Sequence, residues 1–187
     1  LAAGKTTLTN VAKEPEIIDL AEMLNSMGAK IDGAGSDQIT ITGVESLNGT
    51  KYEIPADRIE AGTYLAAAAV TKGEITIEGI NPNRLMKVIE KLNSTGAEIN
   101  LGIDSISINM KKDVPNPVDI TTAPFPEFPT DMQAQFSVIN AISSGTANIY
   151  ESVFENRFMH ILELNRMGCN IAVEGHRAII KGVRHLY

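Results

Sequence analysis

An internal repeat constrains the fold of this chain more than any other feature of its sequence. Three amphipathic segments each end in glycine, and each glycine is followed by a small residue and then by an isoleucine two positions further on. The segments are residues 16–28, 84–96 and 156–168. Glycine readily adopts the left-handed conformation that ends many helices, so each segment is predicted to be a helix. Their recurrence indicates that one supersecondary unit is built several times along the chain.

A second series of glycines repeats in register with the first and predicts the strands. Gly4, Gly73 and Gly145 each precede a strand-like run, and a two-stranded hairpin is expected after each of the three helices. Two further helices, over residues 59–70 and 132–142, are expected to precede the second and third of these strands. The predicted unit is therefore strand, helix, strand, helix, strand, strand, in about two and a half copies.

The polarity of the predicted elements indicates how they are layered. Segments 59–70 and 132–142 are apolar around most of their circumference, so these two helices are expected inside the domain. The strand-like runs alternate apolar and polar residues, as in ITIE at residues 75–78, which places one face on the core and the other in water. We therefore expect central helices with sheets outside them, the reverse of the usual α/β layering.

The first candidate for a functional residue is Asp131, because of the rigid segment that leads to it. Three prolines within residues 124–129 exclude helix and ladder strand there, so a helix can begin only after them. Thr130 and Gln133 fit a capping box, which would place Asp131 in the first turn of that helix. An ionised carboxylate is favoured at such a position and could accept a hydrogen bond from a ligand hydroxyl. From these residues alone, a capping acid without a ligand remains the alternative.

Charge and cysteine content argue against several classes of function. A net charge of −7 and the lack of a basic run argue against nucleic-acid binding, which requires a Lys/Arg surface. A single cysteine excludes an internal disulfide framework and fits a reducing compartment, so a cytoplasmic location is expected. No membrane association is expected, since no apolar segment is long enough to span a bilayer. The chain begins abruptly at Leu1, and we expect it to be a piece of a longer protein.

Two other patterns are weaker indications of a site. The segment GKTT at residues 4–7 is similar to the end of a phosphate-binding P-loop, but it leads into a predicted strand, whereas a P-loop leads into a helix. The histidines have no carboxylate or cysteine partners at metal-ligand spacing, so no metal site is expected. They are His160, His176 and His185.

Four short motifs, in order along the chain, resemble those of a known enzyme family. They are KEPEI at residues 13–17, PADRIEAGT at 55–63, FPTDMQAQ at 128–135 and FENRFMH at 154–160. On these motifs the chain resembles, from end to end, the UDP-N-acetylglucosamine 1-carboxyvinyltransferases, which are enolpyruvyl transferases similar to EPSP synthase. Four motifs in the same order are far more specific than any one of them.

The resemblance implies a fold and a domain organisation. Members of that family have two domains, and each domain is an inside-out α/β barrel built from three βαβαββ repeats. The expected fold class of this chain is therefore α/β (α+β), with such a barrel. Residues 1–55 would be the end of one barrel domain, and residues 56–187 would form most of two repeats of the second. The boundary would fall near Pro55. The rest of the parent chain would then be the partner across the interdomain cleft.

The resemblance also implies an activity. Enzymes of this kind transfer the enolpyruvyl group of phosphoenolpyruvate to the 3-hydroxyl of UDP-N-acetylglucosamine and release phosphate, which is the first committed step of peptidoglycan synthesis. No metal or organic cofactor is implied. Asp131 aligns with the aspartate that contacts this hydroxyl and takes its proton. A carboxylate is a weak base toward an alcohol, so the proton transfer would have to accompany attack on the enol ether.

Other residues are implied as substrate contacts by the same resemblance. Val153 aligns with the residue whose backbone contacts the nucleotide sugar, so its side chain need only be apolar. Arg157 and Arg58 resemble arginines near the interdomain cleft, where a guanidinium could hold phosphate or a carboxylate. Ordinary surface salt bridges would explain these arginines equally well. Glu14 and Asp57 are further cleft candidates, for which helix capping is the expected role.

Some residues that the family uses lie outside this chain. The reactive cysteine or aspartate of a mobile loop, and the basic residues that hold phosphoenolpyruvate, would precede residue 1 or follow Tyr187. We therefore expect the 187 residues alone not to catalyse the transfer. Cys169 is expected to pack in the core instead, because it occupies the position of Ala29 and Ala97 in the other repeats. Two alternatives are an enolpyruvyl transferase acting on shikimate 3-phosphate and a non-catalytic repeat scaffold.

Overall fold

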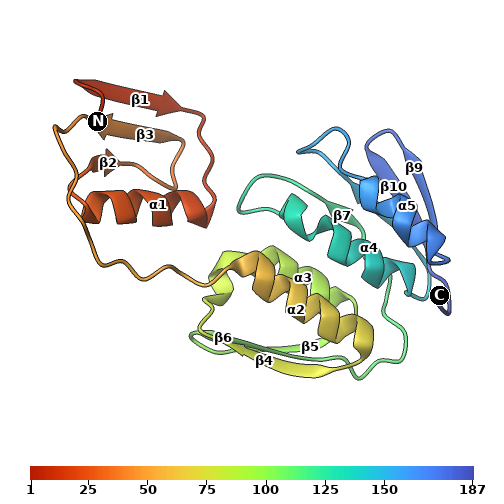
Figure 1. Cartoon of the computed structure of the whole chain (residues 1–187). Helices are drawn as coiled ribbons and strands as arrows, with labels where there is room; N and C mark the ends of the chain where they lie inside the picture. Colours follow the sequence, from red (N-terminus) through yellow and green to blue (C-terminus); the bar gives the residue numbers. More distant parts are fainter. The chain divides into compact units, whose positions relative to one another are not determined.

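The structure is a computed structural model that describes residues 1–187. Its chain divides into two compact units (Figure 1). The N-terminal unit comprises Leu1–Pro55 with Pro124–Pro126, and the C-terminal unit comprises Ala56–Ala123 with Glu127–Tyr187. Among the helices, none combines the length and the apolar character that a bilayer crossing requires.

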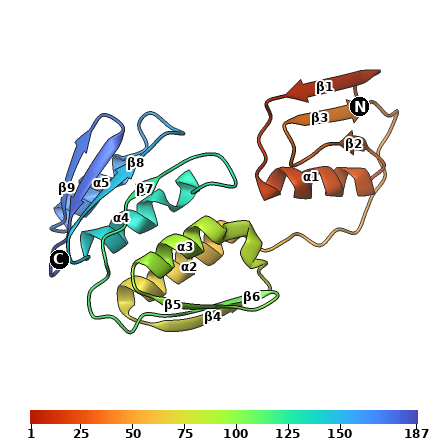
Figure 2. The same ribbon diagram turned by 180° about the vertical axis from the view of Figure 1, so that it is seen from behind.

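The N-terminal unit contains one helix and a three-stranded antiparallel sheet in which β3 is the central strand (Figure 2). Strand β1 begins directly after Gly4, so the GKTT segment enters a strand as predicted and is not a P-loop. Pro15 stands at the first position of α1, where its fixed φ suits a helix and its missing N–H is not needed. The elements are β1 (Lys5–Thr9), α1 (Pro15–Ser26), β2 (Lys30–Asp32) and β3 (Gln38–Thr42).

The C-terminal unit contains two sheets and the helices that accompany them. The first sheet has the strand order β4-β6-β5 and the second β7-β8-β10-β9, with β7 and β8 parallel and all other pairs antiparallel. The elements of the first half are α2 (Arg58–Thr71), β4 (Glu74–Glu78), the 3₁₀ helix η1 (Pro82–Leu85), α3 (Met86–Ser94), β5 (Glu98–Leu101) and β6 (Ser105–Asn109). Those of the second half are β7 (Ile120–Thr121), the 3₁₀ helix η2 (Thr130–Met132), α4 (Gln133–Ala141), β8 (Thr146–Tyr150), α5 (Met159–Arg166), β9 (Asn170–Glu174) and β10 (Arg177–Lys181).

These elements confirm the predicted repeat. One complete copy of strand, helix, strand, helix, strand, strand runs from β7 to β10, and the earlier copies lack their first elements. The glycines after α1, α3 and α5 all have positive φ: Gly28 at 101°, Gly96 at 99° and Gly168 at 94°. After α1 the N–H of Ala29 donates to the carbonyl of Leu24 at 3.0 Å, the long bond of a Schellman cap. Glycine is required at these positions because other residues are strained at such φ values.

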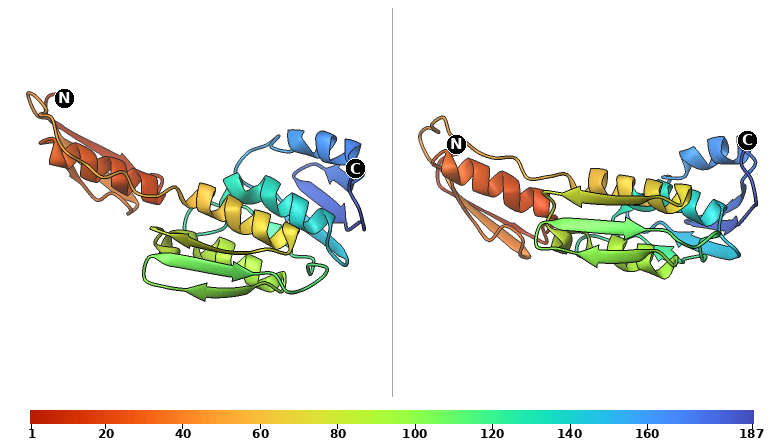
Figure 3. Two further views of the ribbon diagram at one scale, coloured as in Figure 1. Left: turned by 60° about the horizontal axis from the view of Figure 1, so that its bottom comes forward. Right: turned by 90° about the horizontal axis from the view of Figure 1, so that it is seen from below.

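Central helices with sheets outside, the expected layering, are found in the C-terminal unit. Helices α2 and α4 lie side by side (Figure 3); α2 packs on β4 and β6, and α4 packs on β8 and β10. The more amphipathic α3 and α5 contact β5 and β9 respectively. The mixed α/β fold of central helices and outer sheets is therefore confirmed.

The core of this unit is aliphatic, with few aromatic residues. Leu65 of α2 and the α4 residues Phe136 and Ile139 are completely buried and belong to one core cluster. Ile106 and Ile108 of β6 are also completely buried, while the residues on either side of each are partly exposed. This alternation is the one predicted for a strand with one face on the core.

One predicted boundary is wrong. The third amphipathic helix was expected to open near Glu155, but residues 155–158 form a turn and α5 begins only at Met159. The N–H groups of Val153 and Phe154 donate to the side chain of Glu151 at 2.9 and 3.1 Å. These bonds hold the segment after β8 as a loop and delay the start of the helix.

Candidate active site

The turn that carries Asp131 is fixed to helix α4. Residues 123–129 contain neither helix nor strand, as their prolines predict, and the N–H of Ala123 donates to the carbonyl of Phe128 at 2.9 Å. Phe128 is buried and meets Phe136 of α4 edge to face, with the ring centroids 5.0 Å apart and the planes at 90°. This arrangement is favourable for aromatic rings beyond the area it buries. The approach to Asp131 is therefore anchored in the core.

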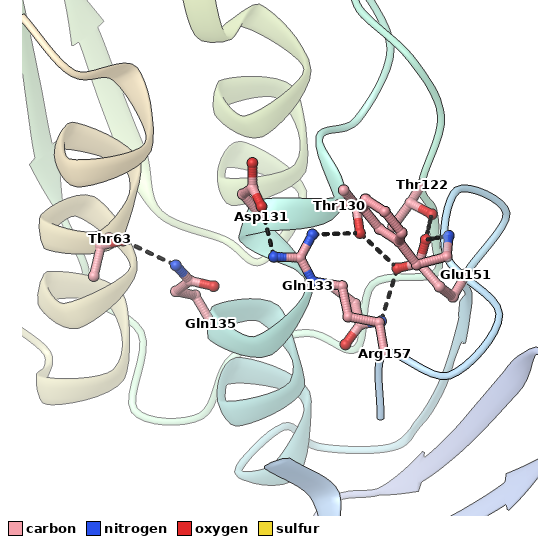
Figure 4. Close-up of polar contacts among 9 residues, drawn as sticks. Thr63, Thr122, Thr130, Asp131, Gln133, Gln135, Glu151 and Arg157 are labelled. Carbon is pink, nitrogen blue, oxygen red and sulfur yellow. Dashed lines mark hydrogen bonds and ion pairs between the residues drawn. The ribbon is translucent and has the colours of Figure 1, made fainter. Parts of the chain in front are cut away.

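Asp131 and Arg157 form an ion pair at the surface of this turn (Figure 4). Arg157 Nη2 donates to Asp131 Oδ1 at 2.6 Å, and the two side chains are 39% and 50% exposed. Arg157 Nη1 also donates to the hydroxyl of Thr130 at 3.1 Å. The guanidinium lies 5.2 Å from the centre of the Phe154 ring, a cation–π distance. Asp131 is thus oriented by an arginine and still has exposed surface with which to meet a ligand.

Glu151 is the centre of the hydrogen-bond network behind Asp131. It follows β8 directly and is only 2% exposed. Its Oε1 accepts from the Thr122 hydroxyl at 2.7 Å and from the N–H groups of Val153 and Phe154. Its Oε2 accepts from two side chains near Asp131 (Figure 4), those of Thr130 at 2.8 Å and Gln133 at 2.9 Å. One buried carboxylate therefore joins the residue that follows β7, η2, α4 and the loop after β8.

These contacts determine the charge state of Glu151. Burial alone would raise the pKa of its carboxyl group, because the ionised form loses water. Hydrogen bonds from the Thr122 side chain, the Val153 N–H, the Thr130 side chain and the Phe154 N–H outweigh burial, so the pKa lies below its ordinary value. Glu151 is therefore a carboxylate at neutral pH and acts only as an acceptor.

The predicted capping box at Thr130 and Gln133 is wrong. Neither Pro129, which precedes η2, nor Met132, which precedes α4, makes a side-chain cap. The Thr130 hydroxyl and the Gln133 amide both donate to Glu151 instead. In a capping box both side chains would accept from backbone N–H groups, whereas here both donate to an ionised carboxylate, which makes the stronger hydrogen bonds. Asp131 lies in the first turn of η2, ahead of α4 rather than within it.

Val153 lies in the loop that Glu151 holds. Its N–H donates to Glu151 Oε1, and its side chain is partly exposed. Any contact of a ligand with its backbone would therefore depend on the position of that carboxylate. Through Glu151 and Thr130, the structure brings together three of the predicted site residues: Asp131, Val153 and Arg157.

The remaining candidates lie at the starts of other helices. Asp57 caps α2, accepting from the N–H groups of Ile59 at 2.7 Å and Glu60 at 3.1 Å, so its expected capping role is confirmed. Arg58, the next residue, is buried at the start of the same helix. Glu14 precedes α1, but its side chain makes no cap hydrogen bond, so the expected capping role is wrong there. Glutamate is a poorer cap than aspartate because its longer side chain does not fold back as readily onto the helix N–H groups.

Sequence reasoning missed Glu151, although the repeat contains a signal for it. The residue directly after the strand is Asn10 in the first copy and Gly79 in the second, with φ values of 54° and 76°. Glu151 occupies that position in the third copy without a positive φ. A large acidic residue in place of residues suited to a left-handed turn indicates that this position has another role.

His160 and Cys169 are both at least half-buried. His160 is half-buried, with Nε2 3.4 Å from the Ser137 hydroxyl. Burial, with the charge of Arg157 adding to it, holds the pKa of His160 below its ordinary value. No group of three or more His, Cys, Asp or Glu side chains is placed to hold a metal ion. Cys169 is buried in the core as predicted, and burial raises the pKa of its thiol.

Comparison with known proteins agrees with this fold. The whole chain, residues 1–187, matches the protein family described as EPSP synthase (3-phosphoshikimate 1-carboxyvinyltransferase). The structure is similar to that of the enolpyruvyl transferase NikO from Streptomyces tendae, with a TM-score of 0.83 and 26% identity over 97% of this chain and 43% of that chain. It shares its fold with EPSP synthase from Acinetobacter baumannii, with a TM-score of 0.54 and 16% identity over 100% of this chain and 43% of that one.

The chain spans less than half the length of both of these proteins. The family match nevertheless covers every residue, and the central helices and outer sheets agree with both structures in fold. The chain therefore belongs to the EPSP synthase (3-phosphoshikimate 1-carboxyvinyltransferase) family of enolpyruvyl transferases.

Proposed function

We propose that the protein containing this chain transfers the enolpyruvyl group of phosphoenolpyruvate to the 3-hydroxyl of UDP-N-acetylglucosamine. The observation that carries the proposal is the half-exposed carboxylate of Asp131, within FPTDMQAQ, held by Arg157 on a turn anchored in the core. A carboxylate so placed can accept the proton of a sugar hydroxyl. Membership of an enolpyruvyl transferase family supports the reaction class.

The proposed reaction is an addition followed by an elimination. The sugar oxygen bonds to C2 of phosphoenolpyruvate while its proton passes to Asp131, and C3 takes up a proton to become a methyl group. Loss of phosphate from C2 and of a proton from C3 then restores the double bond in the product. An alcohol is far less acidic than a carboxylic acid, so the proton transfer to Asp131 accompanies formation of the carbon–oxygen bond. This route needs no metal and no organic cofactor.

The choice of nucleotide sugar over shikimate 3-phosphate is supported by the four sequence motifs. Val153 and the start of the FENRFMH segment lie in the loop that Glu151 holds through the N–H groups of Val153 and Phe154. The similarity to the Acinetobacter baumannii enzyme, at 16% identity, is a similarity of fold and does not favour its substrate.

We further propose the arrangement of this chain in its parent protein. Residues 1–55 would belong to one inside-out barrel domain and residues 56–187 to most of two repeats of another, in agreement with the two compact units. The phosphoenolpyruvate-binding groups would then come from the rest of the parent chain, across a cleft that Arg157 and Arg58 would border. A role in peptidoglycan synthesis in the cytoplasm follows if UDP-N-acetylglucosamine is the acceptor.

The test is turnover by the full-length parent protein. We expect phosphate release that requires both phosphoenolpyruvate and UDP-N-acetylglucosamine, with the enolpyruvyl sugar nucleotide identified by mass spectrometry. Asp131→Asn should lower kcat by about 10²-fold or more, because the proton acceptor is lost. Asp113→Asn is the matched control, since Asp113 is a highly exposed carboxylate paired with Lys72 elsewhere on the surface. Turnover with shikimate 3-phosphate in place of the sugar nucleotide would overturn the proposed substrate.

A further inference from the structure

We propose that Glu151 is a positioning residue for this reaction. It holds the loop that contains Val153 and the turn that contains Asp131 in fixed positions relative to each other. The inference rests on the proposed function, because it assigns the alignment of two parts of that site to one side chain. Glu151 touches neither Asp131 nor any exposed surface of the site, and it acts through the residues bonded to it.

The two oxygens of Glu151 serve different parts of the site. All three donors to Oε1 belong to the loop side: the Thr122 hydroxyl and the N–H groups of Val153 and Phe154. Thr122 also binds this loop directly, because its hydroxyl accepts from the Ser152 N–H at 2.9 Å. The Oε1 side of the carboxylate therefore determines the backbone position of the loop that contains Val153.

The Oε2 side determines the position of the turn that contains Asp131. Thr130 and Gln133, the residues on either side of the Asp131–Met132 pair, both donate to Oε2. One rigid carboxylate group therefore links the loop and the turn, although they lie about 20 residues apart in the chain. Displacing either oxygen would move one half of the site relative to the other.

The charge of Glu151 also sets the direction of the hydrogen bonds that reach Asp131. Because a carboxylate only accepts, the Thr130 hydroxyl must donate its proton to Oε2. A lone pair of the same hydroxyl is then free to accept from Arg157 Nη1 at 3.1 Å. The other terminal nitrogen of Arg157 holds Asp131 Oδ1 at 2.6 Å. The orientation of the proposed proton acceptor thus follows from the ionised state of a buried residue three hydrogen bonds away, through Thr130 and Arg157.

Glutamine in place of Glu151 has nearly the same volume but cannot accept all of these hydrogen bonds in the same direction. It has a single acceptor oxygen for donors that come from two sides, and its amide would point N–H groups at one of those sides. A buried donor that loses its acceptor costs stability as well as geometry. Glu151→Gln is therefore expected to disturb both halves of the site together.

Substitutions on the two sides separate positioning from simple stabilisation. In the full-length enzyme, Thr130→Val removes one of the two Oε2 donors and the acceptor for Arg157. We therefore expect kcat to fall at least about tenfold, with the KM for the sugar nucleotide little changed. Thr122→Val releases the loop, so we expect that KM to rise at least about fivefold, with a smaller change in kcat. Thr130→Ser and Thr122→Ser keep the hydroxyl and should restore the respective constants.

Thr95→Val is the matched control for loss of a buried threonine hydroxyl. Thr95 directly follows α3, in the second copy of the repeat, and is completely buried. Its hydroxyl donates to the Leu92 carbonyl at 2.5 Å. This variant should lower the melting temperature without changing kcat or KM per active site. The positioning role is overturned if Thr130→Val and Thr122→Val alter the kinetic constants no more than Thr95→Val, or alter kcat and KM in the same way. Wild-type enzyme without turnover on UDP-N-acetylglucosamine would instead overturn the proposed function, and the positioning role with it.

Discussion

At Glu151, a single buried side chain links the stability of the fold to pH. The folded chain provides five donors to its carboxylate and holds its pKa below the ordinary value of 4.5, to which the group returns on unfolding. A group whose pKa is depressed by folding stabilises the folded state fully above the ordinary value. That contribution is lost as the pH falls through the depressed pKa.

The corresponding prediction compares Glu151→Gln with the wild-type chain across pH. The variant should be less stable by about 1–3 kcal/mol at pH 7, and the difference should shrink below the ordinary glutamate pKa. Urea unfolding at neutral pH and at several acidic values measures it. Glu163→Gln is the control, because Glu163 is an exposed partner of Arg166 and should change stability little at any pH. A difference that stays constant down to the lowest pH would contradict the account.

Cys169 is predicted to be unreactive in the folded chain. It is buried in the core, and burial raises the pKa of its thiol, so little of the nucleophilic thiolate is present or accessible at neutral pH. Its reaction with an aromatic disulfide reagent should be at least about tenfold slower than in urea-unfolded chain. Release of the coloured thiolate measures the rate, with glutathione as a free-thiol control. Equal rates in the folded and unfolded chains would show that Cys169 is exposed.

Among the elements, α2 makes a close contact with η2, the segment that precedes α4. A Cβ added to Gly62 would lie 2.8 Å from the sulfur of Met132, which is completely buried. The small residues of α2 permit this approach, as the alanine-rich sequence of segment 59–70 indicates. The layering therefore depends on the small volume of this face as much as on its apolar character.

Gly62→Val is predicted to destabilise the chain by about 1–3 kcal/mol, because the added methyl groups overpack the contact with Met132. Ala67→Val is the matched control on the same helix. Because Ala67 is exposed, this change should lower the stability only by the few tenths of a kcal/mol by which valine is a poorer helix former than alanine. Chemical unfolding of both variants measures the effect. Adding Met132→Ala to Gly62→Val should cost less than it does in the wild-type background, and additive effects would show that the two residues do not compete for space.

For the whole molecule, the unequal cores of the two units predict unequal local stability. Of the buried hydrophobic side chains, only Ala21 and Ile39 belong to residues 1–55, whereas the continuous core cluster lies entirely in the C-terminal unit. Small cores bury less apolar area per residue and are less stable. Amide hydrogens of α1 should therefore exchange faster than those of α2, a helix of similar length. Hydrogen–deuterium exchange of the 187-residue chain, corrected for intrinsic rates, measures this, and equal protection in the two helices would contradict it.

Much of the fold could be predicted because its signals are local. Gly28, Gly96 and Gly168 end helices wherever the rest of the unit lies, since a positive φ is a property of the residue itself. The alternation of apolar and polar residues in β6 likewise determines which of its faces is buried, whatever the packing partner. The apolar character of α2 around most of its circumference places the helix in the interior. Boundaries were less predictable, as at α5, where the backbone N–H groups of Val153 and Phe154 bind the Glu151 side chain and the chain forms a loop and a turn before the helix begins.

The sequence by itself determined the repeat and the polarity of its layers, since both follow from residue type and spacing, and it made Asp131 a candidate. Only the tertiary structure decided what Thr130 and Gln133 bind. As a local pattern they form a capping box, but β8 places Glu151 beside them, and the ionised carboxylate takes both donors. The physical reason is that the strongest available acceptor is brought there by strand pairing between distant segments, which no local pattern contains.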